Sequence, residues 1–318
     1  MSNRILCIGD IHLSDRPPSS CTEDYLEDLF VILEHTVDKV QELGVDAVVW
    51  SGDVFHYKQP SRTSHGTVQR AIDIIQSYPV PLYIVPGNHD MLHDRFDSIS
   101  VSQPLGVLFK TGAILLDGWD SENELPIFGV PWKQEWNDQQ VSSGLQLFKN
   151  PENFFNQAQS LVIAHAPLYP KGKELEWENY PVDKWSETMG GRGYCFYGHV
   201  HDSHGIYRES GVEFCNLGAI TRGSLKESEL NRKIRLALWD SVEGFTPVDV
   251  PHKPADQVFR LMEKREVQDT QARLNEFLSQ IGEVSIDIVK VDAIMDHVRT
   301  LNLGPEVEKR IEELLAGV

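Results

Sequence analysis

The chain has 318 residues, of which 41% are apolar and 24% are charged, and this balance argues against wholesale disorder. Its 48 acidic and 29 basic residues give a formal net charge of −19, which disfavours a protein that coats nucleic acid through a generic basic surface. No apolar run approaches the ~18 residues of a membrane-spanning helix, so we expect no such span.

The N-terminal half alternates predicted strands with predicted helices, an order typical of a sheet that is covered on both faces. Residues 4–10 predict a buried strand, and because it begins so near the N-terminus there is no room for a signal peptide. We therefore expect a cytoplasmic protein. The elements that follow are a helix over 22–43 ended by Gly44, a strand at 46–54, a helix at about 62–77 and a strand at 82–86.

The second half has a different rhythm, with short apolar runs that predict mainly strands. We expect them to form a second sheet packed on the first, which gives a layered α/β sandwich with helices outside. The polar stretches 133–159 and 170–192 are expected to be partly irregular insertions that shape a substrate cleft. The apolar runs lie at 113–116, 127–131, 160–164, 194–197, 212–215, 234–239 and 245–250.

After residue 250 the composition shifts toward amphipathic helices, which predicts a small C-terminal helical appendage. Gly304-Pro305 separates the last two helices, as expected for Gly after one helix and Pro at the start of the next. We therefore divide the chain into a catalytic domain, 1–250, and a helical tail, 251–318. The tail helices are expected at 256–281, about 291–302 and 305–316.

Five fragments that follow predicted strands carry carboxylate, amide and imidazole groups. Taken alone, each has an ordinary explanation, since Gly-Asp forms turns, Asp caps helices and a single His is more often a core residue than a ligand. Taken together they indicate a divalent-metal site, because buried Asp and His must be paired or bind metal. The fragments are Gly9-Asp10-Ile11-His12, Gly52-Asp53, Gly87-Asn88-His89-Asp90, Ala164-His165-Ala166 and Gly198-His199-Val200-His201.

The order of these fragments resembles the calcineurin-like metallophosphoesterase family over residues 4 to about 225. The resemblance implies a double β-sandwich flanked by helices, two metal ions at the sheet edges, and hydrolysis of a phosphoester by metal-activated water. Mixed oxygen and nitrogen ligands favour Mn²⁺, with Fe, Zn²⁺ or Mg²⁺ as the alternatives. The implied ligands are Asp10, His12 and His201 for one metal, Asn88, His165 and His199 for the other, and Asp53 as a bridge between them.

His89 is the histidine of these fragments that has no metal role in the family. The resemblance implies that it donates a proton to the leaving oxygen or stabilises the charge that develops there. We expect the neighbouring Asp90 to hold the loop or to orient a neighbouring group, and to take no chemical step.

A narrower resemblance is to the SbcD-type DNA-repair nucleases. It rests on the segments Gly52–Ser61 and Asn216–Leu225 and on Asp at position 90. It implies an exo- or endodeoxyribonuclease of DNA repair or recombination, a coiled-coil ABC-type ATPase partner, and a homodimer. His56 would position the DNA strand or its phosphate, with a solvated loop histidine as the alternative. Arg222 would contact a substrate phosphate, or equally would pair with one of the many acids.

Two features depart from the nuclease pattern. The tail 251–318 is shorter than the capping domain and docking segment of such nucleases, and the acidity is high for a DNA enzyme. Two interpretations of the tail are open. Its helices pack on the protein's own sandwich, or they dock into a groove of the ATPase partner. The alternative function is a phosphodiesterase or phosphatase for a small nucleotide or a phosphoprotein. A silent scaffold is disfavoured, because every ligand position is filled.

Overall fold

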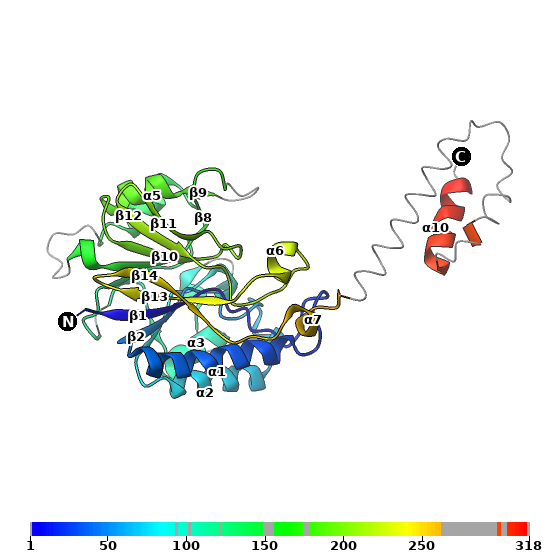
Figure 1. Cartoon of the computed structure of the whole chain (residues 1–318), viewed down its shortest axis with the longest axis horizontal. Coiled ribbons are helices and arrows are strands. Elements are labelled where there is room, and N and C mark those ends of the chain that lie inside the picture. The colour runs from blue at the N-terminus through cyan, green and yellow to red at the C-terminus, as the bar shows by residue number, and fades with distance from the viewer. Residues whose placement is uncertain are drawn as a thin grey trace. The chain divides into compact units, whose positions relative to one another are not determined.

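The computed structural model describes residues 2–92, 95–100, 103–120, 122–148, 156–173, 179–261, 298–299 and 304–316. The chain divides into two units, Met1–Phe259 and Arg260–Val318. The first unit holds both large β-sheets and the candidate site, and helices lie on the outer faces of the sheets (Figure 1). Within the described parts of the chain, no helix has the length and apolar character needed to cross a membrane.

The first sheet has six strands in the order β14-β13-β1-β2-β3-β4. Neighbours from β1 to β4 run parallel, whereas β13 pairs antiparallel with β1, and β14 pairs antiparallel with β13. The strands are β1 (Arg4–Ile8), β2 (Ala47–Trp50), β3 (Leu82–Ile84), β4 (Ile114–Leu115), β13 (Arg235–Asp240) and β14 (Gly244–Asp249). Helices α1 (Tyr25–Leu43), α2 (His65–Ser77) and α3 (Pro104–Lys110) lie along its outer face (Figure 1).

The second sheet also has six strands, in the order β11-β12-β10-β7-β6-β5. Its core strands β6, β7, β10 and β12 run parallel, and β5 and β11 are antiparallel edges. The strands are β5 (Gly118–Trp119), β6 (Ile127–Val130), β7 (Leu161–His165), β10 (Tyr194–Gly198), β11 (Gly205–Glu209) and β12 (Val212–Asn216). A separate two-stranded sheet pairs β8 (Leu168–Tyr169) with β9 (Tyr180–Pro181).

The predicted layered α/β sandwich is confirmed, but the assignment of strands to sheets needs a correction. All seven apolar runs of the second half were expected in the second sheet, whereas β4, β13 and β14 belong to the first. Hydrophobic periodicity identifies a strand but not its neighbour, so it could not reveal that β13 pairs with β1. Strands β5, β8, β9 and β11 were not predicted, because they are short or, in β11, half exposed.

The main core lies between the two sheets. Ile5 and Cys7 of β1 and Val49 of β2 contribute to it from the first sheet, and Ile163 and Phe196 contribute from the second. A second cluster fills the outer face of the second sheet under α4 (Asp138–Gly144) and α5 (Val182–Met189). Because both faces of β1, β2, β7 and β10 are covered, these strands appear in the sequence as continuous apolar runs.

The helices follow their sequence signals where they are described. Gly44 ends α1 in the left-handed conformation with φ 60°, and the Ser64 side chain caps α2 by accepting a hydrogen bond from the Thr67 amide. Part of the stretch 170–192, expected to be partly irregular, forms α5. The remaining short helices are α6 (Glu227–Leu230), α7 (Ala255–Val258) and the 3₁₀ turns Pro60–Arg62, Asn88–Asp90, Phe96–Ser98 and Gln157–Gln159.

In the second unit, helix α10 (Pro305–Ala316) confirms the last predicted tail helix. Most of the helix predicted at 256–281 and nearly all of that at 291–302 lie outside the described residues.

Candidate metal centre

The polar fragments gather beyond the carboxyl ends of β1, β2, β3, β7 and β10, as the rule for ligand sites in parallel sheets predicts. Three of these residues have left-handed backbones, with φ of 54° at His12, 48° at Asp53 and 82° at His199. Non-glycine residues rarely adopt this conformation, and such strain concentrates at functional sites. The left-handed backbone therefore directs these three side chains toward the same region, at the cost of local strain.

One group consists of Asp10, His12 and His201, whose possible ligand atoms all lie within 4.8 Å of one another. The Nε2 atoms of His12 and His201 are 2.9 Å apart. Asp10 is fully buried and His12 nearly so, whereas His201 is exposed. We call this set, which has one ligand side open to solvent, the open group.

A second group consists of Asp53, His165 and His199, again with possible ligand atoms within 4.8 Å. The side-chain oxygen of Asn88 joins it, 3.1 Å from His165 Nε2 and 3.0 Å from His199 Nδ1. His165 has no exposed surface. We call Asn88, His165 and His199 the buried group and treat Asp53 separately, because it also lies near the open group.

Asp53 lies between the two groups. Its Oδ2 atom is 3.5 Å from His12 Nε2 in the open group and 3.4 Å from His165 Nε2 in the buried group. Among the described residues, the ion-pair partners of Asp53 are these two histidines, and that of Asp10 is His165. Two buried carboxylates without Lys or Arg partners, surrounded by converging imidazole nitrogens, fit a pair of divalent metal ions.

The ionisation of two of the histidines, His12 and His199, also suits metal binding, which requires neutral imidazole. Burial, reinforced by neighbouring histidines, holds the pKa of His12 well below its usual value and lowers the pKa of His199 to about 3. Burial by itself would lower the pKa of His165 too, but the charge of Asp53 outweighs it and raises the pKa to about 9. Burial would raise the pKa of Asp53, yet the same pairing with His165 lowers it well below its usual value.

Glycines allow the backbone to approach these side chains closely. A Cβ atom on Gly87 would lie 2.2 Å from Asp53 Oδ1, and one on Gly198 would lie 2.9 Å from Asp10 Oδ1. Either contact would displace a buried carboxylate, which explains why Gly precedes Asn88 and His199.

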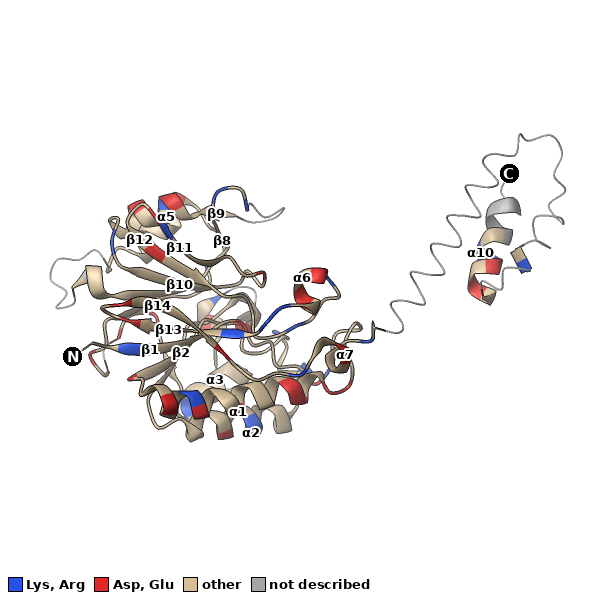
Figure 2. Cartoon of the chain, in the orientation of Figure 1, with Lys and Arg blue, Asp and Glu red and all other residues tan. Residues whose placement is uncertain are grey.

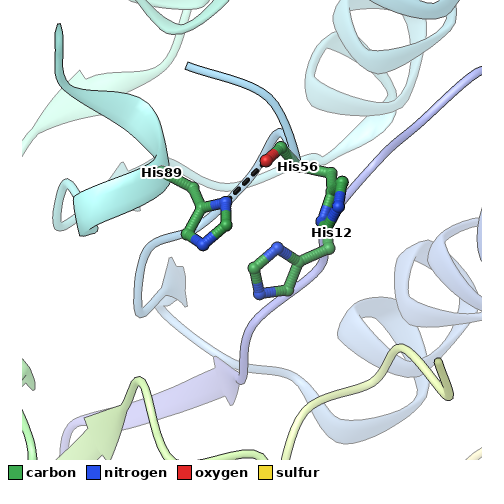
Figure 3. Close-up of side chains that lie close together, drawn as sticks. All are labelled: His12, His56 and His89. Atoms are coloured by element: carbon green, nitrogen blue, oxygen red, sulfur yellow. Dashed lines mark hydrogen bonds between the residues drawn. The ribbon is translucent and has the colours of Figure 1, made fainter. Parts of the chain in front are cut away.

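His89 and His56 lie beside the open group (Figure 3). The His89 ring is 4.9 Å from the His12 ring, and the His56 ring is 5.5 Å from both. The His89 backbone amide donates to Asp53 Oδ1 at 2.8 Å, and its Nδ1 donates to the His56 carbonyl at 2.5 Å. Because Nδ1 is used in this way, Nε2 is the His89 nitrogen left for other partners.

Asp90 ties the loops together. Its carboxylate accepts hydrogen bonds from the amides of Gly87 at 2.9 Å, Val54 at 3.1 Å and Phe55 at 3.4 Å. Burial, together with the nearby Asp53, raises the pKa of Asp90 to about 7. The contacts match the loop-holding role expected from the sequence.

Arg222 does not lie in the site, and its interpretation as a phosphate contact is wrong for this structure. Its guanidinium is buried, pairs with Asp28 of α1 at 3.1 Å and donates to the Lys253 carbonyl at 2.6 Å. A buried cation that already pairs with a carboxylate is unavailable to a substrate phosphate. The structure instead contains the other alternative, in which Arg222 pairs with an acid. This pair is buried inside the protein and does not lie on its surface.

Sequence reasoning missed two groups that position the buried group. The Ser51 carbonyl accepts a hydrogen bond from His165 Nδ1 at 2.7 Å and so fixes that ring. The Trp132 ring lies 4.4 Å from the His199 ring, and its backbone amide bonds to the Pro86 carbonyl at 3.0 Å. Trp132 follows β6, which pairs with β7, so a correct strand order would have placed it beside His165.

Comparison with known proteins was consistent with this geometry. Residues 3–203 match the family described as calcineurin-like phosphoesterase. The DNA double-strand break repair protein Mre11 of Methanocaldococcus jannaschii is 25% identical over 199 residues, which cover 61% of this chain and 50% of that protein. Its counterpart in Saccharolobus solfataricus is 22% identical over 216 residues, or 65% of this chain and 52% of that protein.

The chain thus spans about half the length of these curated relatives. One solved structure, 14% identical, superposes with a TM-score of 0.50 and covers 79% of this chain and 100% of its own, which supports the fold alone. The family match covers more than half of the chain, and it contains all five polar fragments. The chain therefore belongs to the calcineurin-like phosphoesterase family, whose members use divalent metals to hydrolyse phosphoesters.

Proposed function

We propose that the protein is a metal-dependent nuclease that hydrolyses DNA phosphodiester bonds. The observation that carries the proposal is the position of Asp53 Oδ2, within 3.5 Å of a histidine of each group, because a carboxylate shared in this way suits a two-metal centre. The names of the relatives, which are DNA repair proteins, favour DNA as the substrate.

In this proposal Asp10, His12 and His201 hold one metal, Asn88, His165 and His199 hold the other, and Asp53 is shared. Two divalent ions, which we propose to be Mn²⁺, supply a nucleophile from water at neutral pH and offset charge on the phosphoryl oxygens when bound. The chain itself contributes the neutral imidazoles of His12 and His199, buried carboxylates and fixed ring orientations. The Ser51 carbonyl and the Asn88 oxygen hold His165 in place before any substrate arrives.

We assign the proton transfer to His89. Its Nδ1–H is held by the His56 carbonyl, so Nε2 is the nitrogen that carries the transferable proton when the ring is doubly protonated, and it gives that proton to the leaving oxygen. The His56 ring, beside both His12 and His89, positions the DNA strand. His56 therefore acts through both its backbone and its ring.

A coiled-coil ABC-type ATPase subunit and a second copy of the chain remain the partners proposed from the nuclease resemblance. Helix α10 is amphipathic enough to dock in a groove. Co-purification with candidate ATPases tests this part of the proposal. The full chain should retain an ATPase and the Ile311→Asp variant should lose it, and the proposal fails if the full chain retains none.

The nuclease assignment is tested with a labelled DNA hairpin, a cyclic dinucleotide and bis(p-nitrophenyl) phosphate, each with Mn²⁺ or with a chelator. We expect cleavage of the hairpin and the chromogenic diester with Mn²⁺ and none with chelator. Asp53→Asn should be inactive, whereas Asp249→Asn, which removes an exposed carboxylate from β14, should match the wild type. If the small esters were cleaved while the DNA hairpin stayed uncut, the small-nucleotide or phosphoprotein alternative would be favoured.

A further inference from the structure

A cavity of about 360 Å³ opens beside the open group. His12, His201 and His56 line one part of it, and Arg16, Tyr57 and Lys226 line another. This volume is within the range of small-molecule pockets, and the shared histidines make the cavity continuous with the metal centre. A substrate phosphate at the open group would therefore have part of its ester chain in this cavity.

Two cationic side chains that line the cavity are not engaged in ion pairs with the described residues. Arg16, in the loop after β1, and Lys226, just before α6, are both exposed. Neither forms an ion pair with any of the described residues, in contrast to Arg222 and Arg232. They are therefore available to an anion.

The acids near the cavity already have partners. Glu229 pairs with Arg232 at 3.2 Å, and Asp202 accepts a hydrogen bond from Ser228 at 3.4 Å. Elsewhere, acidic residues are spread over α1 and α5 (Figure 2). In a chain with a net charge of −19, two uncommitted cations beside a metal centre are a local exception that suits a phosphate.

Tyr57 gives the cavity an aromatic wall. Its ring centroid lies 4.7 Å from that of His56 in a T-shaped arrangement, and the Arg62 guanidinium lies 4.8 Å from its centroid. The ring is thus held from two directions and remains partly exposed to the cavity. Aromatic rings next to phosphate-binding cations are the usual means of holding single-stranded nucleotides.

We propose that this cavity binds the nucleotide adjacent to the scissile phosphate, with its own phosphate between Arg16 and Lys226 and its base against Tyr57. The inference rests on the proposed function and makes it more specific. The preferred substrate is a strand with at least one further phosphodiester, rather than an isolated mononucleotide ester or a phosphoprotein.

The test pairs protein variants with a chemical change in the substrate. Fluorescent DNA trinucleotides carry either a normal phosphate or a neutral methylphosphonate one position to the 5′ or the 3′ side of the scissile bond. Arg16→Ala/Lys226→Ala is compared with Lys171→Ala/Arg192→Ala, which removes two exposed positive charges that do not line the cavity. Affinity is measured by anisotropy without metal, and kcat and KM are measured with Mn²⁺.

We expect Arg16→Ala/Lys226→Ala to weaken binding and raise KM about tenfold or more on the normal strand, with a smaller effect on kcat. The loss should shrink at least about fivefold on one of the two methylphosphonates, because the contacted charge is then already absent. The slope of log affinity against log salt should fall in magnitude by about 0.7, the value for one phosphate contact on a single strand. The control pair should match the wild type throughout.

Equal losses on normal and methylphosphonate strands, or equal losses in the control pair, would overturn the subsite. A strand that binds in this Arg16- and Lys226-dependent way but is never cut would leave the subsite standing and refute the nuclease. Tyr57→Ala provides a separate measurement, because its effect should vanish when the adjacent nucleotide is abasic. Tyr57→Phe should retain wild-type affinity, and equal losses with and without the base would contradict the stacking role.

Discussion

The open and buried groups share Asp53 but differ in what surrounds them. His201 of the open group is exposed, and a cavity with uncommitted cations adjoins it. His165 of the buried group has no exposed surface, its Nδ1 bonds to the Ser51 carbonyl, and Trp132 lies against its neighbour His199. We therefore propose that the buried group holds an ion and that the open group brings an ion together with a substrate.

This difference has a physical basis in the sheets. In the buried group, His165 is the last residue of β7 and His199 directly follows β10, and these adjacent strands lie in the middle of the second sheet. The open group combines Asp10 and His12 after β1 with His201, which lies three residues beyond the end of β10. Loops outside the sheet tolerate exposure, and binding residues commonly lie on them.

Removing Asp53 should have the largest effect, because both groups then lose the carboxylate that lies between them. Asp53→Asn should reduce bound Mn²⁺ from about two ions per chain to below about one. Turnover should fall by more than the ~10–100-fold that substitutions behind the ligands cost. Metal analysis after gel filtration measures the first effect and cleavage of the chromogenic diester the second. Full occupancy in the variant would show that Asp53 is not shared.

Loss of His89 should affect chemistry without affecting either group. We expect His89→Ala to retain both ions while kcat falls ~10²–10⁴-fold, the usual contribution of a proton donor. The same metal analysis and steady-state kinetics measure it, with His35→Ala on α1 as the matched histidine control. Full turnover in His89→Ala would refute the proton-donor role.

Trp132 should distinguish the two groups. Trp132→Ala is expected to weaken the affinity of the buried group about tenfold, since the His199 ring loses its packing partner, and to spare the open group. Trp132→Phe should restore the affinity. Titration calorimetry and the visible spectrum of the Co²⁺-substituted protein report the change. Trp119→Ala breaks a comparable aromatic stack on Phe148 and serves as the control, and a loss shared by both groups would contradict the assignment.

A smaller, pH-dependent effect concerns the loop that carries Arg16. Burial alone would raise the pKa of Asp15, but hydrogen bonds from Thr67 and Ser64 outweigh it and lower the pKa. A carboxylate whose folded pKa is depressed contributes stability above its unfolded value near 3.8, and that contribution disappears as pH falls through the folded pKa.

Asp15→Asn should therefore lower the thermal midpoint at pH 6. The loss in the free energy of unfolding should be less than about 1 kcal/mol, because solvent screens this site. Near pH 2 the variant and the wild type should converge. Thermal melts at the two pH values measure this, and a constant difference between the two proteins would contradict it.

Local motifs in the sequence were enough to predict the strand ends and the set of side chains that meet there. Each fragment follows its strand directly, so the alternation of strands and helices already places Asp10, Asp53 and Asn88 at one edge. The sheet to which β13 belongs and the partner of Arg222 depend on contacts between residues far apart in the chain. Trp132 could be recognised only once β6 was known to pair with β7.

The most direct test is diffraction from crystals grown with manganese, measured on both sides of the manganese absorption edge. The account predicts two anomalous peaks, one among Asp10, His12 and His201 and the other among Asn88, His165 and His199, with the Asp53 carboxylate between them. Crystals in which manganese is absent from this cluster, or in which Asp53 contacts neither ion, would contradict it.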